Sequence, residues 1–114
     1  MHPAISARLK RLVPVSRLCP YLDFDFDTRM RARYRITRGR VNRYIVQLEV
    51  RAAGKWRHAV RYDTPHRFAH RDLYRTRGRA VKSDLKMTFE EALTYALDDL
   101  RENWESYREQ FLGE

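Results

Sequence analysis

The residues whose types suit chemistry gather in one segment, residues 61–74, which reads RYDTPHRFAHRDLY. The segment holds two histidines, two aspartates, three arginines and two tyrosines in fourteen positions. Histidine exchanges protons near neutral pH, and arginine holds phosphate through a planar fork of N–H donors. Cleavage of an RNA phosphodiester without a metal needs such groups: a base, an acid, and cations around the phosphate.

In this hypothesis, His66 and His70 transfer the protons. Asp63 or Asp72 would fix the tautomer of a histidine by accepting a hydrogen bond from its ring. The alternative needs no catalysis: His66 caps a turn, His70 pairs with a neighbouring carboxylate, and the segment is a salt-bridged edge strand. Composition leaves both interpretations open.

Substrate binding in the catalytic hypothesis falls to cations and aromatic rings of the same segment. Three cations would hold the phosphate as charge develops on it: Arg61, Arg67 and Arg71. Tyr62 or Tyr74 would stack a base or donate a proton. The required residue types are therefore all present, and their convergence on one place is an expectation for the structure.

A zinc site is a further hypothesis, because His66 and His70 have the spacing of a helical zinc pair. Pro65 and the absence of a helical apolar period favour a strand, on which the two histidines would lie about 13 Å apart. Cys19 is the only cysteine, so a structural zinc site would be short of ligands. The sequence predicts no metal and no cofactor.

A second feature that suits anion binding is the sequence RMRARYRI, residues 29–36. In a strand, side chains alternate between faces, so four arginines share one face over about 20 Å: Arg29, Arg31, Arg33 and Arg35. Like charges without carboxylate partners repel one another. We therefore expect an anion on this face, either a nucleic-acid backbone or the acidic helix of another copy in a homodimer.

Net charge supports the same expectation, since the chain carries +9 at pH 7. Residues 88–114 hold eight acidic and two basic residues, whereas residues 1–87 hold 22 basic and seven acidic ones. Twenty of the 24 basic residues are arginine, which suits bidentate phosphate contact; a general preference for arginine codons is the alternative explanation. This asymmetry indicates contact with a polyanion. Among nucleic acids, RNA is favoured, because the metal-free cleavage considered above uses its 2′-hydroxyl.

The elements that must position these residues form an α+β fold, predicted as one domain over residues 1–114. We expect an antiparallel meander of about four to five strands, because the connections are too short for parallel crossovers. The alternating DFDFD of residues 23–27 would place Phe24 and Phe26 on one side. Residues 43–51 would form a central strand. In residues 55–63, four side chains would share the buried phase: Trp56, His58, Val60 and Tyr62.

Two helices complete the predicted fold, a short one over residues 4–12 and a long one at the C-terminus. Thr88 and Glu91 have the spacing of a capping box, which marks the start of the long helix. Eight apolar positions with helical spacing follow and should cover the sheet: Phe89, Leu93, Ala96, Leu97, Leu100, Trp104, Tyr107 and Phe111. A single cysteine and the lack of a long apolar run predict a cytoplasmic protein without membrane contact.

A family resemblance accompanies these patterns. The chain is similar to a family of small uncharacterised bacterial proteins with a Tyr-Asp-x-x-His, His-x-Asp core. The similarity lies in VRYDTPHRFAHRDLY, in Gly78 and in TFEEALTYALDDLRENWESYREQFL. More remotely, residues 61–74 resemble the TumE-type toxins of toxin–antitoxin pairs. That resemblance implies a small α+β ribonuclease-like toxin with an antitoxin partner, in which His66 and His70 act with support from Asp63 and Asp72. The alternatives are a nucleic-acid-binding accessory domain without catalysis and a protein-interaction module using its acidic helix.

Overall fold

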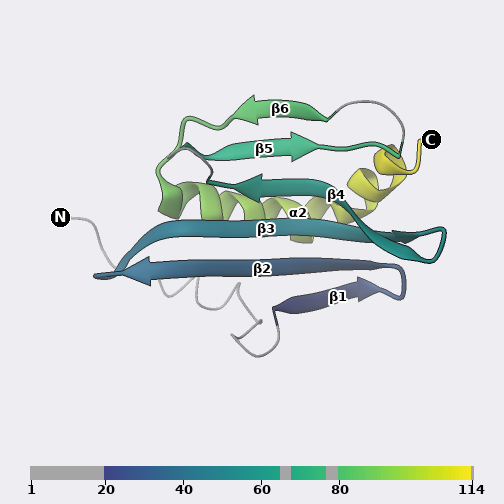
Figure 1. Ribbon diagram of the computed structural model, residues 1–114, viewed down its shortest axis with the longest axis horizontal. Helices are drawn as coiled ribbons and strands as arrows, with labels where there is room; N and C mark the ends of the chain where they lie inside the picture. Colours follow the sequence, from purple (N-terminus) through teal and green to yellow (C-terminus); the bar gives the residue numbers. More distant parts are fainter. Residues whose placement is uncertain (1–19, 65–67, 77–79, 114) are drawn as a thin grey trace.

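The computed structural model describes residues 20–64, 68–76 and 80–113, which form an antiparallel sheet and one long helix (Figure 1). The sheet has six strands, and their spatial order is their order in the chain. The elements are β1 (Tyr21–Asp25), β2 (Thr28–Thr37), β3 (Arg40–Ala52), β4 (Lys55–Asp63), β5 (His70–Leu73), β6 (Val81–Asp84) and α2 (Phe89–Phe111). The predicted α+β meander with a C-terminal helix is confirmed.

The predicted number of strands, four to five, is wrong, and β6 is the strand that the sequence did not reveal. Its sequence, VKSD, has one apolar residue and no alternation, so it carries no pattern that distinguishes a strand from a loop. Backbone pairing with β5, from His70↔Asp84 to Leu73↔Val81, holds it in the sheet. The helix expected over residues 4–12 lies outside the described residues.

Strand β1 ends two residues earlier than the alternation of DFDFD predicts. Phe24 packs with its ring stacked on Trp104 of the helix, at 5.4 Å between centroids. The strand ends at Asp25, and Phe26 lies in the following turn with 85% of its surface exposed. Arg108 of the helix reaches this turn and pairs with Asp27 at 3.0 Å, so the far end of the helix is tied to the β1–β2 turn.

Helix α2 begins at the predicted cap. The Thr88 side chain accepts a hydrogen bond from the Glu91 N–H, and the Glu91 carboxylate accepts one from the Thr88 N–H. The helix packs against β3 and β4 (Figure 1), and its buried residues are Ala92, Leu93, Ala96, Leu97, Leu100 and Phe111. The predicted apolar face is therefore confirmed. No helix among the described residues is long and apolar enough to span a membrane.

Two tight turns stiffen the long central hairpins. Arg38 and Gly39 join β2 to β3, and Ala53 and Gly54 join β3 to β4. All four residues have positive φ, between 53° and 78°, as a two-residue type I′ turn requires. Because this turn twists in the same sense as the strands, pairing in both hairpins extends to the turn, as far as Thr37↔Arg40 and Ala52↔Lys55.

A bulge changes the predicted phase of β4. Leu48 pairs with Val60 and Glu49 pairs with His58, so Ala59 is an extra residue that reverses the alternation. Val60 lies on the same face as the helix, as predicted. The prediction that His58 and Trp56 share that face is wrong, because the bulge turns both toward the other side of the sheet.

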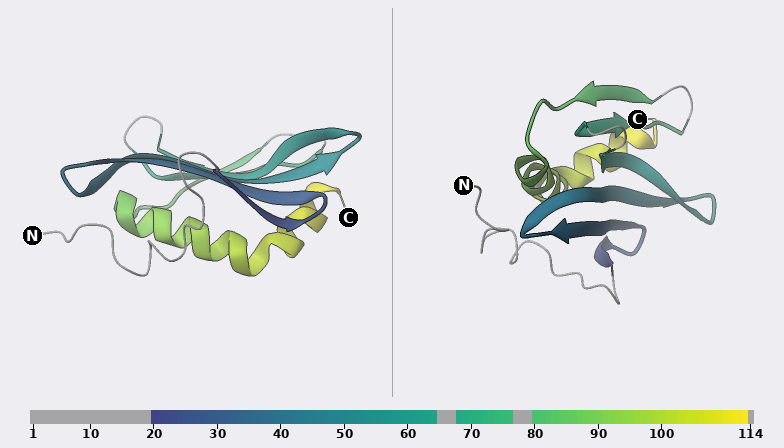
Figure 2. Two further views of the ribbon diagram at one scale, coloured as in Figure 1. Left: turned by 90° about the horizontal axis from the view of Figure 1, so that it is seen from below. Right: turned by 60° about the vertical axis from the view of Figure 1, so that its left-hand side comes forward.

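The sheet consequently has two unlike faces (Figure 2). The helix-covered face carries the buried core of β2, β3 and β4, including Met30, Val46, Leu48 and Tyr62. We call the opposite side the open face, because no described helix or strand lies over it. Since residues paired across antiparallel strands project to the same side, the strand register determines which residues line the open face.

Candidate nucleic-acid interface

Charged residues line the open face in rows that run across the strands. One row crosses five strands and consists of Arg31, Gln47, Arg61, Asp72 and Lys82. The adjacent row consists of Arg33, Ile45, Asp63, His70 and Asp84. The structure therefore brings most of the predicted site residues of residues 61–74 onto one face of the sheet.

His70 lies on β5 between two aspartates. Asp63 on β4 and Asp84 on β6 occupy the positions directly opposite His70 on either side. Phe68 contacts the His70 ring edge-on, at 6.1 Å between centroids, and keeps 57% of its surface exposed. His66 and Arg67 lie outside the described residues, so the expected pairing of two histidines stays a prediction.

Asp63 and Asp72 lie close to the middle of the open face. The Asp63 carboxylate is 3.0 Å from Arg61 Nε. Burial raises the pKa of Asp63, and the positive charge of Arg61 opposes that rise. Asp72 is buried; its Oδ2 accepts a hydrogen bond of 3.3 Å from the Tyr74 hydroxyl, and its Oδ1 has no partner. These two carboxylates balance part of the positive charge around them.

Arg71 does not join this group. It pairs across β4 and β5 with Tyr62, whose side chain is fully buried on the helix-covered face. Burial lowers the pKa of Arg71, but contact with Tyr62 and the nearby Tyr107 and Tyr95 outweighs this, and the pKa is raised. The sheet therefore separates Arg71 from Arg61 and His70, with which sequence reasoning had grouped it.

The four arginines of β2 share the open face, as predicted, but they differ in their surroundings. Arg29 is held in place: its Nε is 2.7 Å from Glu49 Oε1, and its guanidinium lies between the rings of Tyr21 and Trp56, 4.1 and 4.0 Å from their centroids. Arg31 is half-buried, and its Nε has no hydrogen-bond partner. The role of Arg29 is thus structural, and the remaining arginines are the candidates for a ligand.

Arg33 and Arg35 are exposed, and among the described residues neither forms an ion pair. Arg35 lies directly opposite Arg43 of β3, so two like charges face each other. We define the basic stripe as the open-face residues Arg31, Arg33, Arg35 and Arg43. No Asp or Glu occurs from position 28 to position 48, so the two strands that carry the stripe bring no carboxylate of their own before Glu49.

Two residues of the open face were missed by sequence reasoning, because the bulge at Ala59 was not foreseen. The His58 ring contacts Tyr74 edge-on, at 4.4 Å between centroids. Burial lowers the pKa of His58, and the positive charges of Arg61 and Arg57 lower it further. These effects favour the neutral form of His58, whose ring packs against Tyr74. The Trp56 that sandwiches Arg29 was missed for the same reason.

The helix-covered face holds a hydrogen-bonded network of its own. One Asp99 oxygen accepts hydrogen bonds from the Tyr62 hydroxyl and, at 2.5 Å, from the Tyr107 hydroxyl. Asn103 donates to the other Asp99 oxygen at 2.9 Å. This network joins β4 to the helix and fixes their relative position. In the part of the chain that the structure describes, no three His, Cys, Asp or Glu side chains cluster as a metal site would require.

Fold and site together define a class of protein: a six-stranded meander with one face closed by a C-terminal helix and an open face rich in arginine. Comparison with known families identifies the group within that class. The chain belongs to the family described as "Domain of unknown function (DUF7718)", whose model matches residues 17–114. Neither the curated proteins nor the solved structures contain a match. The family agrees with the expected uncharacterised domain and adds no activity or partner.

Proposed function

We propose that this protein binds nucleic acid, RNA in particular, through the basic stripe of its open face. The observation that carries the proposal is the stripe itself: exposed Arg33, Arg35 and Arg43 without carboxylate partners among the described residues. Self-repulsion of this kind is relieved when phosphates neutralise the guanidinium groups and release their counterions.

The spacing of the stripe suits a phosphate backbone. Side chains at alternate strand positions lie about 6.7 Å apart on one face. That repeat is close to the separation of neighbouring phosphates, so Arg31, Arg33 and Arg35 can each contact one. The paired backbone of β2 and β3 keeps this repeat regular from Thr28↔Val50 to Arg35↔Arg43. The backbone positions of these arginines are consequently fixed before binding, which removes the backbone part of the entropy cost.

Fluorescence anisotropy with a labelled RNA oligonucleotide tests the proposal directly. Four phosphate contacts predict that log K falls with log salt with a slope of about −3 for a single strand. Replacing Arg33 and Arg35 by Ala should reduce the magnitude of that slope by about 1.4 and weaken binding about tenfold. Affinity that is insensitive to salt, or unchanged in the double variant, would contradict the proposal.

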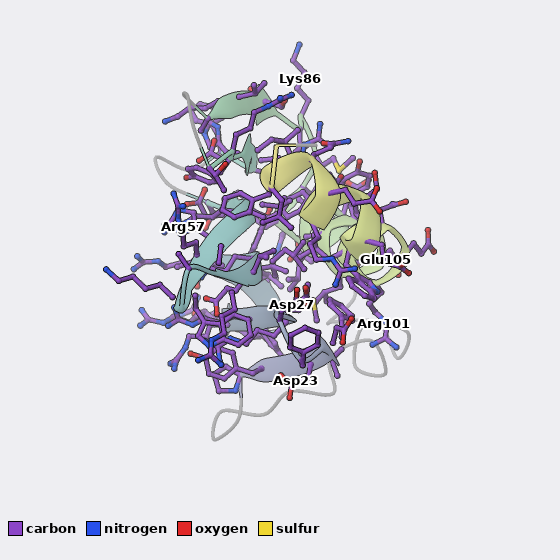
Figure 3. The ribbon with its side chains drawn as sticks, turned by 90° about the vertical axis from the view of Figure 1, so that its right-hand side faces the viewer. Asp23, Asp27, Arg57, Lys86, Arg101 and Glu105 are labelled. Carbon is purple, nitrogen blue, oxygen red and sulfur yellow. The ribbon has the colours of Figure 1, made fainter. Side chains whose placement is uncertain are left out.

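Arg101→Ala is the matched control, because it removes one positive charge at a different surface. Figure 3 shows Arg101 and Glu105 at the helix, which covers the face of the sheet opposite the open face. Its affinity for RNA should stay within about twofold of the wild type, since long-range effects of an exposed charge are screened beyond about 10 Å. A loss as large as that of the stripe variant would mean that net charge, not the open face, determines binding.

RNA cleavage on the same face is a second candidate, supported by the position of His70 directly opposite Asp63. A carboxylate beside a histidine can hold its tautomer, and Arg61 is close enough to Asp63 to bring a cation to the same place. A toxin with an antitoxin partner is the form that this candidate would take. Incubation with labelled RNA and electrophoresis tests it: cleavage that His70→Ala abolishes supports it, and intact RNA with the wild type rejects it.

A further inference from the structure

The distribution of charge on the open face also indicates which nucleic acid fits. We infer that the ligand is single-stranded and that its bases lie over β4 and β5, where aspartates favour bases with an amino group. This inference rests on the proposed function. It names the strand type and the base class, which nucleic-acid binding alone leaves open.

The open face has a basic half on β2 and β3 and a half of mixed charge on β4, β5 and β6. The basic stripe occupies β2 and β3. The adjoining strands present three carboxylates and two cations toward the same side: Asp63, Asp72, Asp84, Arg61 and Lys82. Neighbouring strands are about 4.8 Å apart, so the basic half is little more than one strand spacing wide. A phosphate backbone that follows β2 thus has uncharged Ile45 and Gln47 beside it, and then Asp63 and Arg61 on β4.

A duplex fits this division poorly. The two backbones of an RNA duplex flank a wide, shallow minor groove, which is broader than the basic stripe. With one backbone on the basic stripe, the other would lie over β4 to β6, where the three carboxylates outnumber Arg61 and Lys82. Phosphates facing carboxylates repel one another, and the repulsion opposes binding. A single strand has no second backbone, so all of its phosphates can lie over the basic stripe.

The mixed half suits unpaired bases instead. Carboxylates accept hydrogen bonds from base amino groups, such as N4 of cytosine. Asp63 and Asp84 flank His70, and Asp84 is exposed. Phe68, exposed and in contact with the His70 ring, offers a surface on which a base can stack. Cytosine, adenine and guanine carry an amino group and uracil does not, so this half of the face should disfavour uracil.

Three labelled RNA probes of about ten nucleotides test both parts of the inference: oligo(C), oligo(U) and a mixed-sequence duplex. In anisotropy titrations at one salt concentration, oligo(C) should bind about tenfold more tightly than oligo(U). The duplex should bind more weakly than oligo(C) by a similar factor. Equal affinity for the duplex and the single strand, or for oligo(C) and oligo(U), overturns the corresponding part.

The double variant Asp63→Asn, Asp84→Asn ties the base preference to the carboxylates. It removes two negative charges, so affinity for every probe should rise, and the informative quantity is the ratio between oligo(C) and oligo(U). That ratio should fall toward one, because an amide offers a donor to O4 of uracil. An unchanged ratio overturns the role of the aspartates. Asp84→Asn alone, at an exposed edge position, repeats the test if the double variant fails to fold.

The outcomes separate this inference from the proposed function. If none of the three probes binds, the proposed function fails and the inference fails with it. If all three bind with equal affinity and a steep salt dependence, nucleic-acid binding stands and the preference for unpaired, amino-bearing bases is wrong.

Discussion

The two faces of the sheet are built from the same strands and differ in what their side chains meet. On the helix-covered face, Met30, Val46 and Leu48 are fully buried, and the polar groups of Tyr62 and Asp99 bond to each other. On the open face, the same strands carry Arg33, Arg35 and Arg43, exposed and without ion pairs among the described residues.

This difference teaches how one strand can serve two purposes. Strand alternation lets β2 contribute Met30 to the core while Arg31 faces away from it. Burial of an apolar core side chain stabilises the fold. Unpaired guanidinium groups are stabilised only when an anion binds to them. We therefore expect substitutions on the helix-covered face to change stability and substitutions in the basic stripe to change binding.

The largest expected effect is on the helix-covered face, at Leu97. Leu97 is fully buried against the sheet, so Leu97→Ala removes apolar contacts and leaves a cavity. The free energy of unfolding should fall by about 3 kcal/mol, measured by urea denaturation. RNA affinity of the folded variant, measured at low temperature, should match that of the wild type. A loss of affinity without a loss of stability would break the division between the faces.

A smaller effect is expected for the Asp99 network. Tyr107→Phe removes one hydroxyl that donates to Asp99, while Tyr62 and Asn103 still donate to that carboxylate. Because the ring itself stays packed, the variant should lose about 1 kcal/mol of stability in urea. Asn103→Ala, which removes a donor at an exposed position, should cost less. A larger loss at Asn103 would show that the exposed end of the network dominates.

Alkaline pH should act on the same face. Burial, followed by the hydrogen bond to Asp99, raises the pKa of Tyr107 to about 12, and burial also raises the pKa of Tyr62. An unfolded tyrosine has a pKa of about 10, so above that pH the unfolded chain releases protons that the folded chain retains. Stability is fully present below pH 10 and falls as pH rises toward 12. Urea midpoints across this range should decline less in Tyr107→Phe than in the wild type.

The smallest expected effect on stability belongs to the basic stripe. Replacing Arg33 and Arg35 by Ala removes two exposed charges that repel each other, and it breaks no ion pair among the described residues. The free energy of unfolding should therefore change by less than about 0.5 kcal/mol. Thermal denaturation at low salt measures this. A loss of more than about 2 kcal/mol would mean that the stripe supports the fold rather than a ligand.

The sequence predicted the elements whose local signals agree with their tertiary role. The capping box of Thr88 and Glu91 and the apolar spacing after it located α2, and strict alternation located the arginines of β2 on one face. In each case the signal lies within one short stretch of the chain: a capping pair, a 3.6-residue period or a two-residue period.

What the sequence did not predict depends on pairing between strands. The extra residue Ala59 looks like any other position, yet it turns His58 toward the open face and Val60 toward the helix. The short strand β6 exists because β5 offers it backbone partners. Likewise, the separation of Arg71 from Arg61 follows from alternation around the register of β4 and β5, which residue composition does not contain.

The most direct measurement is an NMR titration of isotope-labelled protein with unlabelled single-stranded RNA. If the basic stripe binds the strand, amide signals of β2 and β3 next to Arg31, Arg33, Arg35 and Arg43 should shift in proportion to the ligand added. Signals from the outer side of α2 around Arg101 should stay in place. Shifts confined to the helix, or none at RNA concentrations far above those of the protein, would contradict binding through the open face.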